Sequence, residues 1–440
     1  MATAGFGGRH FFVIARREGR PVRGPYDTGD CAMLKNILPL SALLLGSAFL
    51  LFAGGVNGLI LPIRGEIEGF SAASLGLLGT GWAVGYVLGC LRTAALVGKV
   101  GHVRAFGVMC AVATISILLS LLFITPWVWI PLRGLSGFCF AGAAMVVESW
   151  LNERADHTNR GRIFGLYTMV NLAATTAGQL VLTMGNPAGI FFFVLAAIVY
   201  CMALLPTAVS AASIPSPLTS VKLDLRGLWI NSPIAVFAVF MVGISNGAFG
   251  TLSPVYAAKA GLEVHEVALF VALPVLAGAI TQIPVGYLSD RFDRRQVLIA
   301  TAMIGLIADA TFIFATPQGL LNNLIYGALF GSAVFAMQPI IIAHANDHAV
   351  PGTAIQVSGG LLLIFGIGTI IGPTIAGFAM STFGDTSLFW TTAVAHVLIV
   401  LFALVRLRAR SGLADEDKQA FRAGPMGRSA TPETSALAEA

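Results

Sequence analysis

The sequence has few charged residues for its length. Only 11% of its 440 residues are Asp, Glu, Lys or Arg, whereas a soluble globular domain carries about 25%. Hydrophobic residues make up 56%, and the mean hydropathy is +0.84. So few charges cannot cover the surface of a water-soluble domain of this size, which excludes a soluble enzyme, a soluble binding module and a disordered chain. The composition therefore predicts a protein that crosses a membrane many times.

Motifs for metal, redox and nucleotide chemistry are also missing. The five Cys residues form no CxxC pair, and four lie inside apolar runs, which argues against a metal site or a disulfide framework. No GxxxxGK[ST] loop for ATP and no HExxH zinc motif occurs. We therefore expect no cofactor, no metal and no intramembrane enzyme. The net charge of +5 sits in short clusters between apolar runs, so we expect a lipid bilayer rather than nucleic acid as the partner.

Twelve apolar runs are present, each close to the ~20 residues that a membrane-spanning helix needs. Only residues 210–232 form a longer polar connection, and Pro215 and Pro217 there discourage a continuous helix. The sequence thus predicts an all-α membrane protein of twelve transmembrane helices in two six-helix bundles, residues 36–209 and 233–406. The runs are residues 37–62, 72–97, 105–124, 127–150, 162–184, 189–209, 233–257, 266–288, 297–315, 321–344, 355–380 and 388–405.

The two ends of the chain are polar. Residues 1–35 carry six basic residues and lack the apolar stretch and cleavage site of a secretory signal, so we expect a polar cytoplasmic tail. Met33 stands just before the first apolar run and is an alternative start of translation. Residues 407–440 are rich in Ala, Glu, Ser and Pro, which predicts a disordered cytoplasmic tail.

The positions of Lys and Arg predict the orientation of the helices. With the N-terminus inside, the inner segments hold 22 of these residues and the outer turns hold two, Arg64 and Lys259. Basic residues concentrate on the cytoplasmic side of membrane proteins. We therefore expect both termini in the cytoplasm and a multi-pass, monomeric protein in the inner (cytoplasmic) membrane.

The chain contains an internal repeat. Asn57 in the first run and Asn246 in the seventh are each followed by Gly and lie 189 residues apart. Gly178 in the fifth run and Gly372 in the eleventh lie 194 apart, and the basic turns after the second and eighth runs fall between these landmarks. These landmarks occur in the same order in both halves and at nearly the same spacing, which predicts a duplicated six-helix unit. Parallel repeats of this kind place a substrate site between the halves, near the middle of the bilayer.

Two motifs carry a resemblance to a known family. The stretch GYLSDRFDRR at residues 286–295 resembles the signature turn of the major facilitator superfamily, which follows helices 2 and 8 in that family; Asp293 replaces a usual Gly. After helix 2 the copy is degraded, because Gly98 stands where the acid is expected. The stretch RGLSGFCFA at residues 133–141 is similar to the arginine-bearing pattern of helix 4 in that family.

The resemblance covers residues 36–406, and ESWLN at residues 148–152 with NRGR at residues 159–162 is similar to a bacterial branch of mostly unassigned substrate. It implies a secondary transporter that works by alternating access. We expect a small organic solute, with uptake of a nutrient or vitamin such as a riboflavin-like compound and with a coupling proton. The alternative is a proton-coupled exporter of drugs or metabolites, although helix 5 lacks the GxxxGP pattern of some exporters, since Gln179 follows Gly178.

Polar residues within the apolar runs are the candidates for substrate binding. Arg133 lies about six residues into the fourth run, and a charge at that depth costs ~2.5–3.5 kcal/mol unless it faces protein or water. It is expected to bind an anionic or carbonyl group or to tune a proton site, or else to pack against backbone carbonyls. Asn57 and Asn246 either bind a polar solute or join helices. The weaker candidates for the cavity are Tyr256, Gln282, Gln338 and Asn171.

Charged groups near the inner surface are the candidates for gating. Asp290 among several bases is expected to hold the inner faces together in one conformation and to release them in the other. Glu148 and Arg92 lie at comparable depth, so they either form a gate pair or extend to the surface, and Glu148 alternatively carries the coupling proton. The complete gating set is Gly286, Asp290, Arg291, Arg294, Arg295, Glu148 and Arg92.

Two further titratable residues, Asp309 and His396, lie within the ninth and twelfth runs. In the fold of the resembled family these helices are peripheral. Asp309 also lies past the middle of its run, towards the outer interface. We therefore expect both side chains to extend to the membrane surface rather than to form a proton relay.

Overall fold

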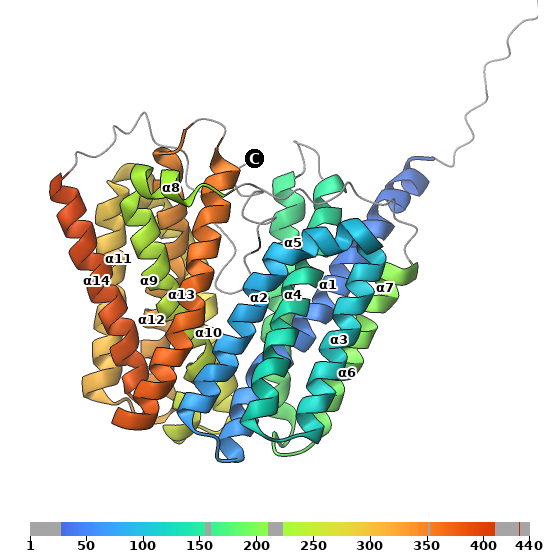
Figure 1. The fold of residues 1–440 in the computed structure, drawn as a ribbon, viewed down its shortest axis with the longest axis horizontal. Coiled ribbons are helices and arrows are strands. Elements are labelled where there is room, and N and C mark those ends of the chain that lie inside the picture. The colour runs from blue at the N-terminus through green and yellow to red at the C-terminus, as the bar shows by residue number, and fades with distance from the viewer. Residues whose placement is uncertain (1–27, 155–159, 210–222, 351–352, 410–430, 432–440) are drawn as a thin grey trace, which may run out of the picture.

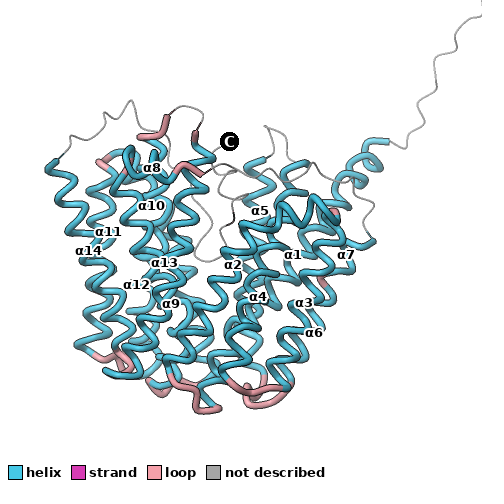
Figure 2. Tube along the Cα trace, viewed as in Figure 1, coloured by secondary structure: helices cyan, strands magenta, loops and turns pink. Residues whose placement is uncertain are grey.

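The structure is a computed structural model that describes residues 28–154, 160–209, 223–350, 353–409 and 431. This part of the chain is helical throughout and contains no strand. Figure 1 shows two groups of helices side by side. Figure 2 shows that the turns joining successive helices lie at the two ends of the molecule. The first group comprises α1 (Thr28–Ile67), α2 (Ala72–Val100), α3 (His102–Leu122), α4 (Pro126–Arg154), α5 (Arg160–Leu180), the 3₁₀ turn η1 (Val181–Met184), α6 (Phe191–Met202) and α7 (Leu204–Val209).

The second group has the same succession of long helices. It comprises α8 (Leu225–Asn231), α9 (Pro233–Lys259), α10 (Val264–Arg291), α11 (Arg294–Ala310), the π-helical turn η2 (Thr311–Ala315), α12 (Gly319–Asp347), α13 (Ala354–Phe383) and α14 (Ser387–Ala409). Ten helices in the described residues are long and apolar enough to cross a membrane. A shorter apolar helix at Phe191–Thr207 and the more polar α5 complete the predicted twelve. The predicted all-α membrane fold is confirmed.

The boundaries differ from the prediction in two places. Helix α1 begins at Thr28, so it includes Met33 and part of the segment predicted to be a tail. The predicted linker contains α8, whose first turn is capped because the Asp224 carboxylate accepts a hydrogen bond of 2.8 Å from the backbone N–H of Gly227. Pro215 and Pro217, most of the predicted N-terminal tail and almost all of the C-terminal tail lie outside the described residues.

The internal repeat reappears in the packing of the helices. Gly178 on α5 lies against α1 so closely that a Cβ atom would overlap the carbonyl oxygen of Phe52. Gly372 on α13 lies in the same way against the carbonyl oxygen of Ile244 on α9. Small residues permit this approach of two backbones in membrane helices. Corresponding glycines thus make corresponding contacts in the two halves.

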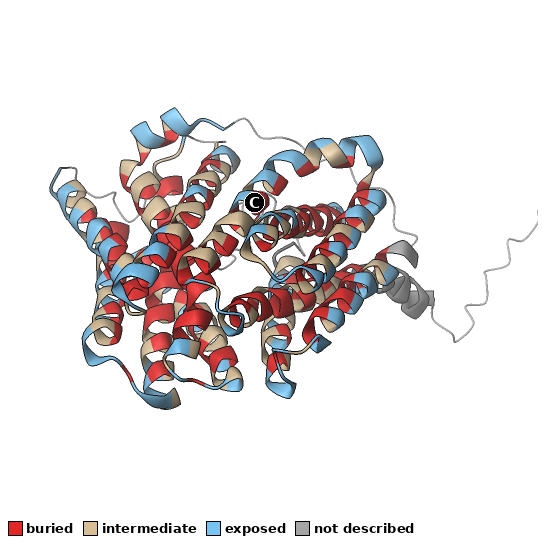
Figure 3. Cartoon of the chain, turned by 60° about the horizontal axis from the view of Figure 1, so that its bottom comes forward, coloured by how far each residue is buried: buried red, intermediate tan, exposed pale blue. Residues whose placement is uncertain are grey.

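Side chains are buried where a helix faces other helices and exposed where it faces outwards. Figure 3 shows buried residues where helices face one another. Large apolar side chains are nevertheless exposed on the outside of long helices, such as Met169 and Ile283, at 70% and 77% exposure. An apolar outer surface is what contact with lipid requires.

The two halves meet through α2 and α13. The Ala73 backbone N–H donates to the Ser381 hydroxyl at 2.8 Å, and the Thr80 and Thr374 hydroxyls lie 2.6 Å apart. These contacts lie in the first part of α2 and the last part of α13, where Figure 1 shows the two groups of helices converging. We call this contact the α2–α13 seam, and it comprises Ala73, Gly76, Thr80, Thr374, Gly377 and Ser381.

Candidate functional site

A cavity of about 280 Å³ lies between the two halves. It receives side chains from α1, α2, α4, α5 and α6 of the first half and from α9, α10 and α12 of the second. Binding sites for small molecules are typically ~300–1,000 Å³, mostly apolar, with a few polar groups. The cavity is close to the lower end of this range, which suits a small solute, and it lies between the two halves, as the repeat predicts.

Arg133 contributes a basic side chain to the wall of this cavity. Its side chain extends from α4 and is only 8% exposed. No described residue forms an ion pair or a hydrogen bond with its guanidinium group. A buried cation without a counter-ion is costly. An anionic or carbonyl-bearing group in the cavity would therefore stabilise Arg133.

The two repeat-related asparagines both line the cavity, but their contacts differ. The Asn57 Nδ2 atom donates to the Ser136 hydroxyl at 3.1 Å and to the Tyr200 hydroxyl at 3.5 Å. Its Oδ1 atom has no partner among the described residues. Both polar atoms of the Asn246 side chain are buried without a partner there. Asn57 therefore joins three helices, whereas Asn246 retains its full hydrogen-bonding capacity for a solute.

Glu148 lies deep in the wall of the cavity and is 1% exposed. The Tyr167 hydroxyl donates to its Oε1 atom at 3.0 Å, and the Thr431 hydroxyl donates to its Oε2 atom. Arg92 on α2 is exposed and forms no ion pair with Glu148. The predicted gate pair is therefore not formed in this conformation, because the two side chains point into different environments.

Asn171 also lines the cavity, and its Oδ1 atom accepts a hydrogen bond of 2.8 Å from the Ser47 hydroxyl. The structure places the other three predicted cavity residues elsewhere. Tyr256 packs within the second half, where its ring lies edge-on to Phe389 at 4.8 Å. Gln282 and Gln338 are buried on α10 and α12 but are not part of the cavity wall.

The reason for this correction is the rotation of the helix. A residue advances by about 100° around an α-helix, so Tyr256, ten residues after Asn246, points about 80° away from it. Helix α9 is apolar on all sides, and the sequence alone does not indicate which side faces the cavity. The same uncertainty of rotation applies to Gln282 and Gln338.

Aromatic residues on the cavity wall were not predicted from the sequence. Trp82 on α2 stacks on Tyr86 at 5.0 Å and lies 6.0 Å from Phe140 on α4. Trp82, Phe140 and Tyr200 all line the cavity. Within an apolar helix an aromatic ring that faces a cavity has the same sequence signal as one that faces lipid. These rings offer a flat apolar surface beside Arg133.

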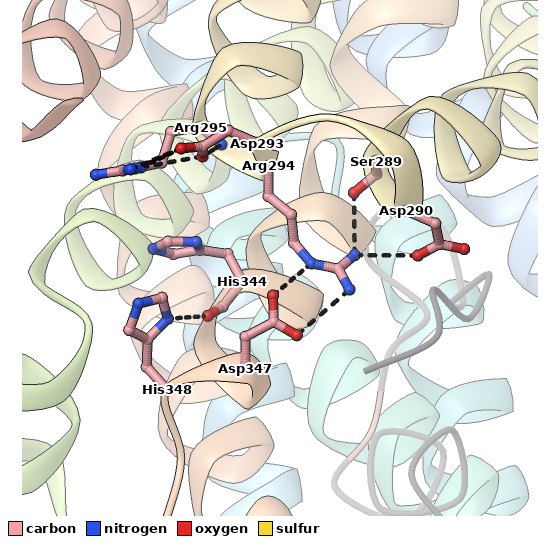
Figure 4. A network of polar contacts seen from close by, with 8 residues as sticks. All are labelled: Ser289, Asp290, Asp293, Arg294, Arg295, His344, Asp347 and His348. Carbon is pink, nitrogen blue, oxygen red and sulfur yellow. Dashed lines mark hydrogen bonds and ion pairs between the residues drawn. The ribbon is translucent and has the colours of Figure 1, made fainter. Parts of the chain in front are cut away.

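The signature turn after α10 forms a polar cluster, shown in Figure 4. The Arg294 side chain is buried, and its Nε atom donates to Asp347 Oδ2 at 2.6 Å while Nη2 donates to Oδ1 at 3.3 Å. Its Nη1 atom donates to the Ser289 hydroxyl at 3.0 Å and lies 3.6 Å from Asp290 Oδ1. A two-point arginine–carboxylate pair is strong and directional. It holds the turn to the end of α12.

Asp293, the residue that departs from the family pattern, has a structural function. It precedes α11 and accepts hydrogen bonds from the backbone and side chain of Arg295, with 2.6 Å between Asp293 Oδ2 and Arg295 Nη2. Partial burial on its own would raise the pKa of Asp293, but the hydrogen bonds and charge of Arg295 outweigh it and hold the pKa below its usual value. Arg295 also donates to the backbone carbonyl of Arg406 on α14, at 3.2 Å.

The remaining residues of the predicted gating set lie on the same turn. The Arg291 guanidinium lies 4.2 Å above the ring of Tyr287, and Gly286 is buried within α10. In the first half, a Cβ atom on Gly98 would meet nothing within 4 Å. The turn of the second half is thus a bonded cluster, whereas the corresponding position in the first half is open.

The predicted exposure of Asp309 and His396 is wrong. Both residues are 0% exposed, and the His396 Nδ1 atom lies 2.7 Å from Asp309 Oδ2. The two helices that carry them, α11 and α14, turn these side chains towards each other and towards α9, not towards lipid. Their separation of 87 positions in the chain concealed this pairing from the sequence.

No group of three His, Cys, Asp or Glu side chains in the described part of the chain has the arrangement that a metal ion needs. The polar groups of the cavity are instead an arginine, amides, hydroxyls and one carboxylic acid. This set is suited to recognising an organic solute through charge and hydrogen bonds.

Comparison with known proteins connects this architecture to a family. The family described as "Major Facilitator Superfamily" matches residues 43–349 and 235–433. A protein of Escherichia fergusonii named "Uncharacterized MFS-type transporter YcaD" is 26% identical over 386 residues, which cover 85% of this chain and 97% of that protein. An uncharacterized MFS-type transporter of Enterobacter sp. (strain 638) is 27% identical over 376 residues, which cover 83% and 95% of the two chains.

Solved structures show the same fold. The nucleoside transporter NupG superposes with a TM-score of 0.72 at 14% identity, covering 84% of this chain and 98% of that one. A bacterial homolog of the human lysosomal transporter Spinster, in an inward-facing and occupied conformation, gives 0.69 at 16% identity, covering 90% and 99%. With the twelve helices, the central cavity and the signature turn, these matches show that this multi-pass membrane protein belongs to the Major Facilitator Superfamily of transporters.

Proposed function

We propose that this transporter imports a small organic solute that carries an anionic or carbonyl group and a planar ring, in symport with protons. It acts in the inner membrane with both termini in the cytoplasm. The observation that carries the proposal is the buried Arg133 guanidinium, which lines the cavity and has no bonded partner among the described residues. A solute group that compensates for this charge gains the favourable interaction that the protein itself does not supply.

The other groups on the wall support the same kind of solute. Asn246 offers a donor and an acceptor without partners, and Trp82 and Phe140 offer flat apolar surfaces. Riboflavin-like compounds combine a planar ring with carbonyl groups and are one class to test. The structural neighbours named for nucleosides and for D-xylose–proton symport share only the fold with this chain, but those names include ring-bearing solutes and proton coupling.

The proton gradient is the proposed source of energy for uptake. A proton that crosses 100 mV supplies ~2.3 kcal/mol, which is enough for modest accumulation. The second candidate is proton-coupled export of drugs or metabolites, which the apolar and aromatic wall of the cavity also favours. Uptake into inside-out vesicles upon acidification of the lumen would favour export.

The test is an untargeted measurement of metabolite uptake by cells that express the protein. Cells with the wild-type chain should accumulate at least one compound that cells with Arg133→Ala do not. Arg133→Lys keeps the positive charge but loses the planar fork, so we expect partial uptake. Arg226→Ala, a change at an exposed arginine of α8, is the matched control and should behave as wild type. Equal uptake with Arg133→Ala and wild type would refute the proposed role of the cavity.

A further inference from the structure

The second half contains a buried pair of titratable residues outside the cavity. The Asp309 carboxylate and the His396 imidazole are completely buried between α9, α11, α12 and α14. Placing ionisable groups inside a membrane helix bundle is costly, and such groups commonly serve proton or ion pathways. The cavity described above does not use this pair.

The hydrogen bonds around the pair are specific. The Thr392 hydroxyl donates to Asp309 Oδ1 at 2.6 Å, and His396 Nδ1 lies 2.7 Å from Asp309 Oδ2. On its other side, His396 Nε2 lies 3.1 Å from the Ser245 hydroxyl of α9. An ionised carboxylate only accepts hydrogen bonds, so it fixes the Nδ1–H tautomer and leaves Nε2 to accept from Ser245.

The surroundings of the pair contain no competing charge among the described residues. On α12 the nearest ring is that of Phe330, at 6.0 Å from the His396 ring, and on α11 Gly305 leaves room for the imidazole. On α9 the partner is Ser245, and on α14 it is Thr392. Within the described part of the chain, the charged or titratable neighbour of Asp309 is His396.

Helix α9 connects this pair to the cavity. Ser245, which contacts His396, immediately precedes Asn246, which lines the cavity with both polar atoms unpaired. The first half has a corresponding contact, because Tyr200 of α6 accepts a hydrogen bond from Asn57 of α1. Helix α14 therefore contacts a helix of the cavity wall, as α6 does, although Tyr200 of α6 also lines the cavity itself.

We propose that Asp309 and His396 form a proton-binding site that couples the transport cycle to a proton gradient, with Ser245 transmitting its state to α9. The inference rests on the proton coupling proposed above. One proton binds at His396 Nε2 and is later released from the same atom. The net charge of the pair changes from −1 to 0, and Asp309 stays ionised throughout.

The proton changes one hydrogen bond between helices. When Nε2 is free, Ser245 donates its hydroxyl hydrogen to it. When Nε2 carries a proton, it donates to the Ser245 oxygen, and the hydroxyl hydrogen must turn to another acceptor. A contact between α14 and α9 therefore depends on protonation, and α9 is the helix that presents Asn246 to the solute.

The first test measures protonation directly and needs no solute. The ¹⁵N NMR signals of labelled histidines are recorded in liposomes from pH 5 to pH 9, and His396→Gln identifies the His396 signal. We expect His396 to change protonation state in this range. Asp309→Asn should lower its proton affinity at least tenfold, because the imidazolium loses its counter-ion. A His396 signal that keeps one protonation state from pH 5 to pH 9 would overturn the proposal.

The second test measures conformation, also without solute. Spin labels at Val100 and Val350, on a background without native cysteines, report the distance between the halves. We expect the ratio of the two distance populations to change at least threefold between pH 5.5 and pH 8.5. This change should disappear with Asp309→Asn and His396→Gln and persist with His265→Gln, a matched control at an exposed histidine.

Ser245→Ala keeps the pair and removes only its link to α9, so it provides a second variant should the charged pair be needed for folding. It should retain the NMR titration of His396 and lose the pH response of the distance. A wild-type pH response in this variant, or in both pair variants, would show that the pair only stabilises the bundle. Neither test uses a solute, so a failure of the uptake experiment can be distinguished from a failure of the proton site.

Discussion

The two halves of the molecule share a backbone plan but differ in where they place charge. In the first half the charges face the cavity, as Arg133 and Glu148 do, and the turn after α2 has lost its acid. In the second half the turn after α10 is a bonded cluster, and the charged pair Asp309–His396 lies away from the cavity. A duplicated scaffold has thus acquired two different sets of polar groups. We propose that the first half mainly recognises the solute and the second half mainly controls conformation.

The largest expected effect separates the two signature turns. Arg294→Ala removes the two-point ion pair with the buried Asp347 carboxylate, which should cost ~3–5 kcal/mol. The comparison variant on the turn after α2, Arg104→Ala, removes an exposed basic side chain and should cost within ~0.5 kcal/mol. Thermal unfolding in detergent measures both. The double variant Arg294→Met, Asp347→Leu should recover most of the lost stability. Equal losses of stability in Arg294→Ala and Arg104→Ala would contradict the comparison.

The next effect tests whether the halves pack alike. Gly178→Ala and Gly372→Ala each place a methyl group against a backbone carbonyl of the neighbouring helix, and each should cost ~1–3 kcal/mol. Gly98→Ala meets open space and should not destabilise the protein. The measurement is again the unfolding temperature in detergent. Tolerance of one buried substitution but not of the other would show that the repeat does not extend to these contacts.

A smaller effect distinguishes the two asparagines. Asn57→Leu removes hydrogen bonds to Ser136 and Tyr200 and should lower stability by ~1 kcal/mol. Asn246→Leu removes no bond within the described protein, so stability should hold while solute affinity falls up to about tenfold, equivalent to ~1.4 kcal/mol. Thermal unfolding and uptake kinetics on the same preparations separate these outcomes. If both variants unfold, each amide joins helices and does not mainly bind the solute.

The smallest effect concerns Asp290. Its side chain is 42% exposed and lies 3.6 Å from Arg294, so Asp290→Asn should leave the unfolding temperature almost unchanged. If the pair must break during transport, its weakening should change turnover about two- to fivefold, the change that ~0.5–1 kcal/mol produces. We expect slower transport, because Asp290→Asn removes a charge from the cluster that holds the turn after α10. Unchanged turnover would remove Asp290 from the gating set.

The fold was predictable from the sequence because bilayer thickness fixes the length of each span. The count of twelve helices and the offset between Asn57 and Asn246 needed only apolar runs and spacing. The structure extends α1 to Thr28 and adds α8 to the linker, since short or terminal helices lack such a constraint.

The candidate site was predictable only in part. Arg133, Asn57, Asn246 and Asn171 line the cavity, since a polar group in the middle of a span must face protein or water. Tyr256 packs elsewhere because an apolar helix gives no sign of its rotation. The pairing of Asp309 with His396 depends on the contact of two distant helices and could not be derived from either helix alone.

The α2–α13 seam has an energetic consequence for alternating access. It is built from glycines, hydroxyl groups and one backbone amide, without a large interlocking side chain among its six members. Parting it exposes a handful of hydrogen-bonding groups that water can satisfy at once, at a cost of ~0.5–1.5 kcal/mol for each bond. Separating α2 from α13 here therefore breaks hydrogen bonds but no ion pair among these six members, which is a kind of contact that a transport cycle can break and form again.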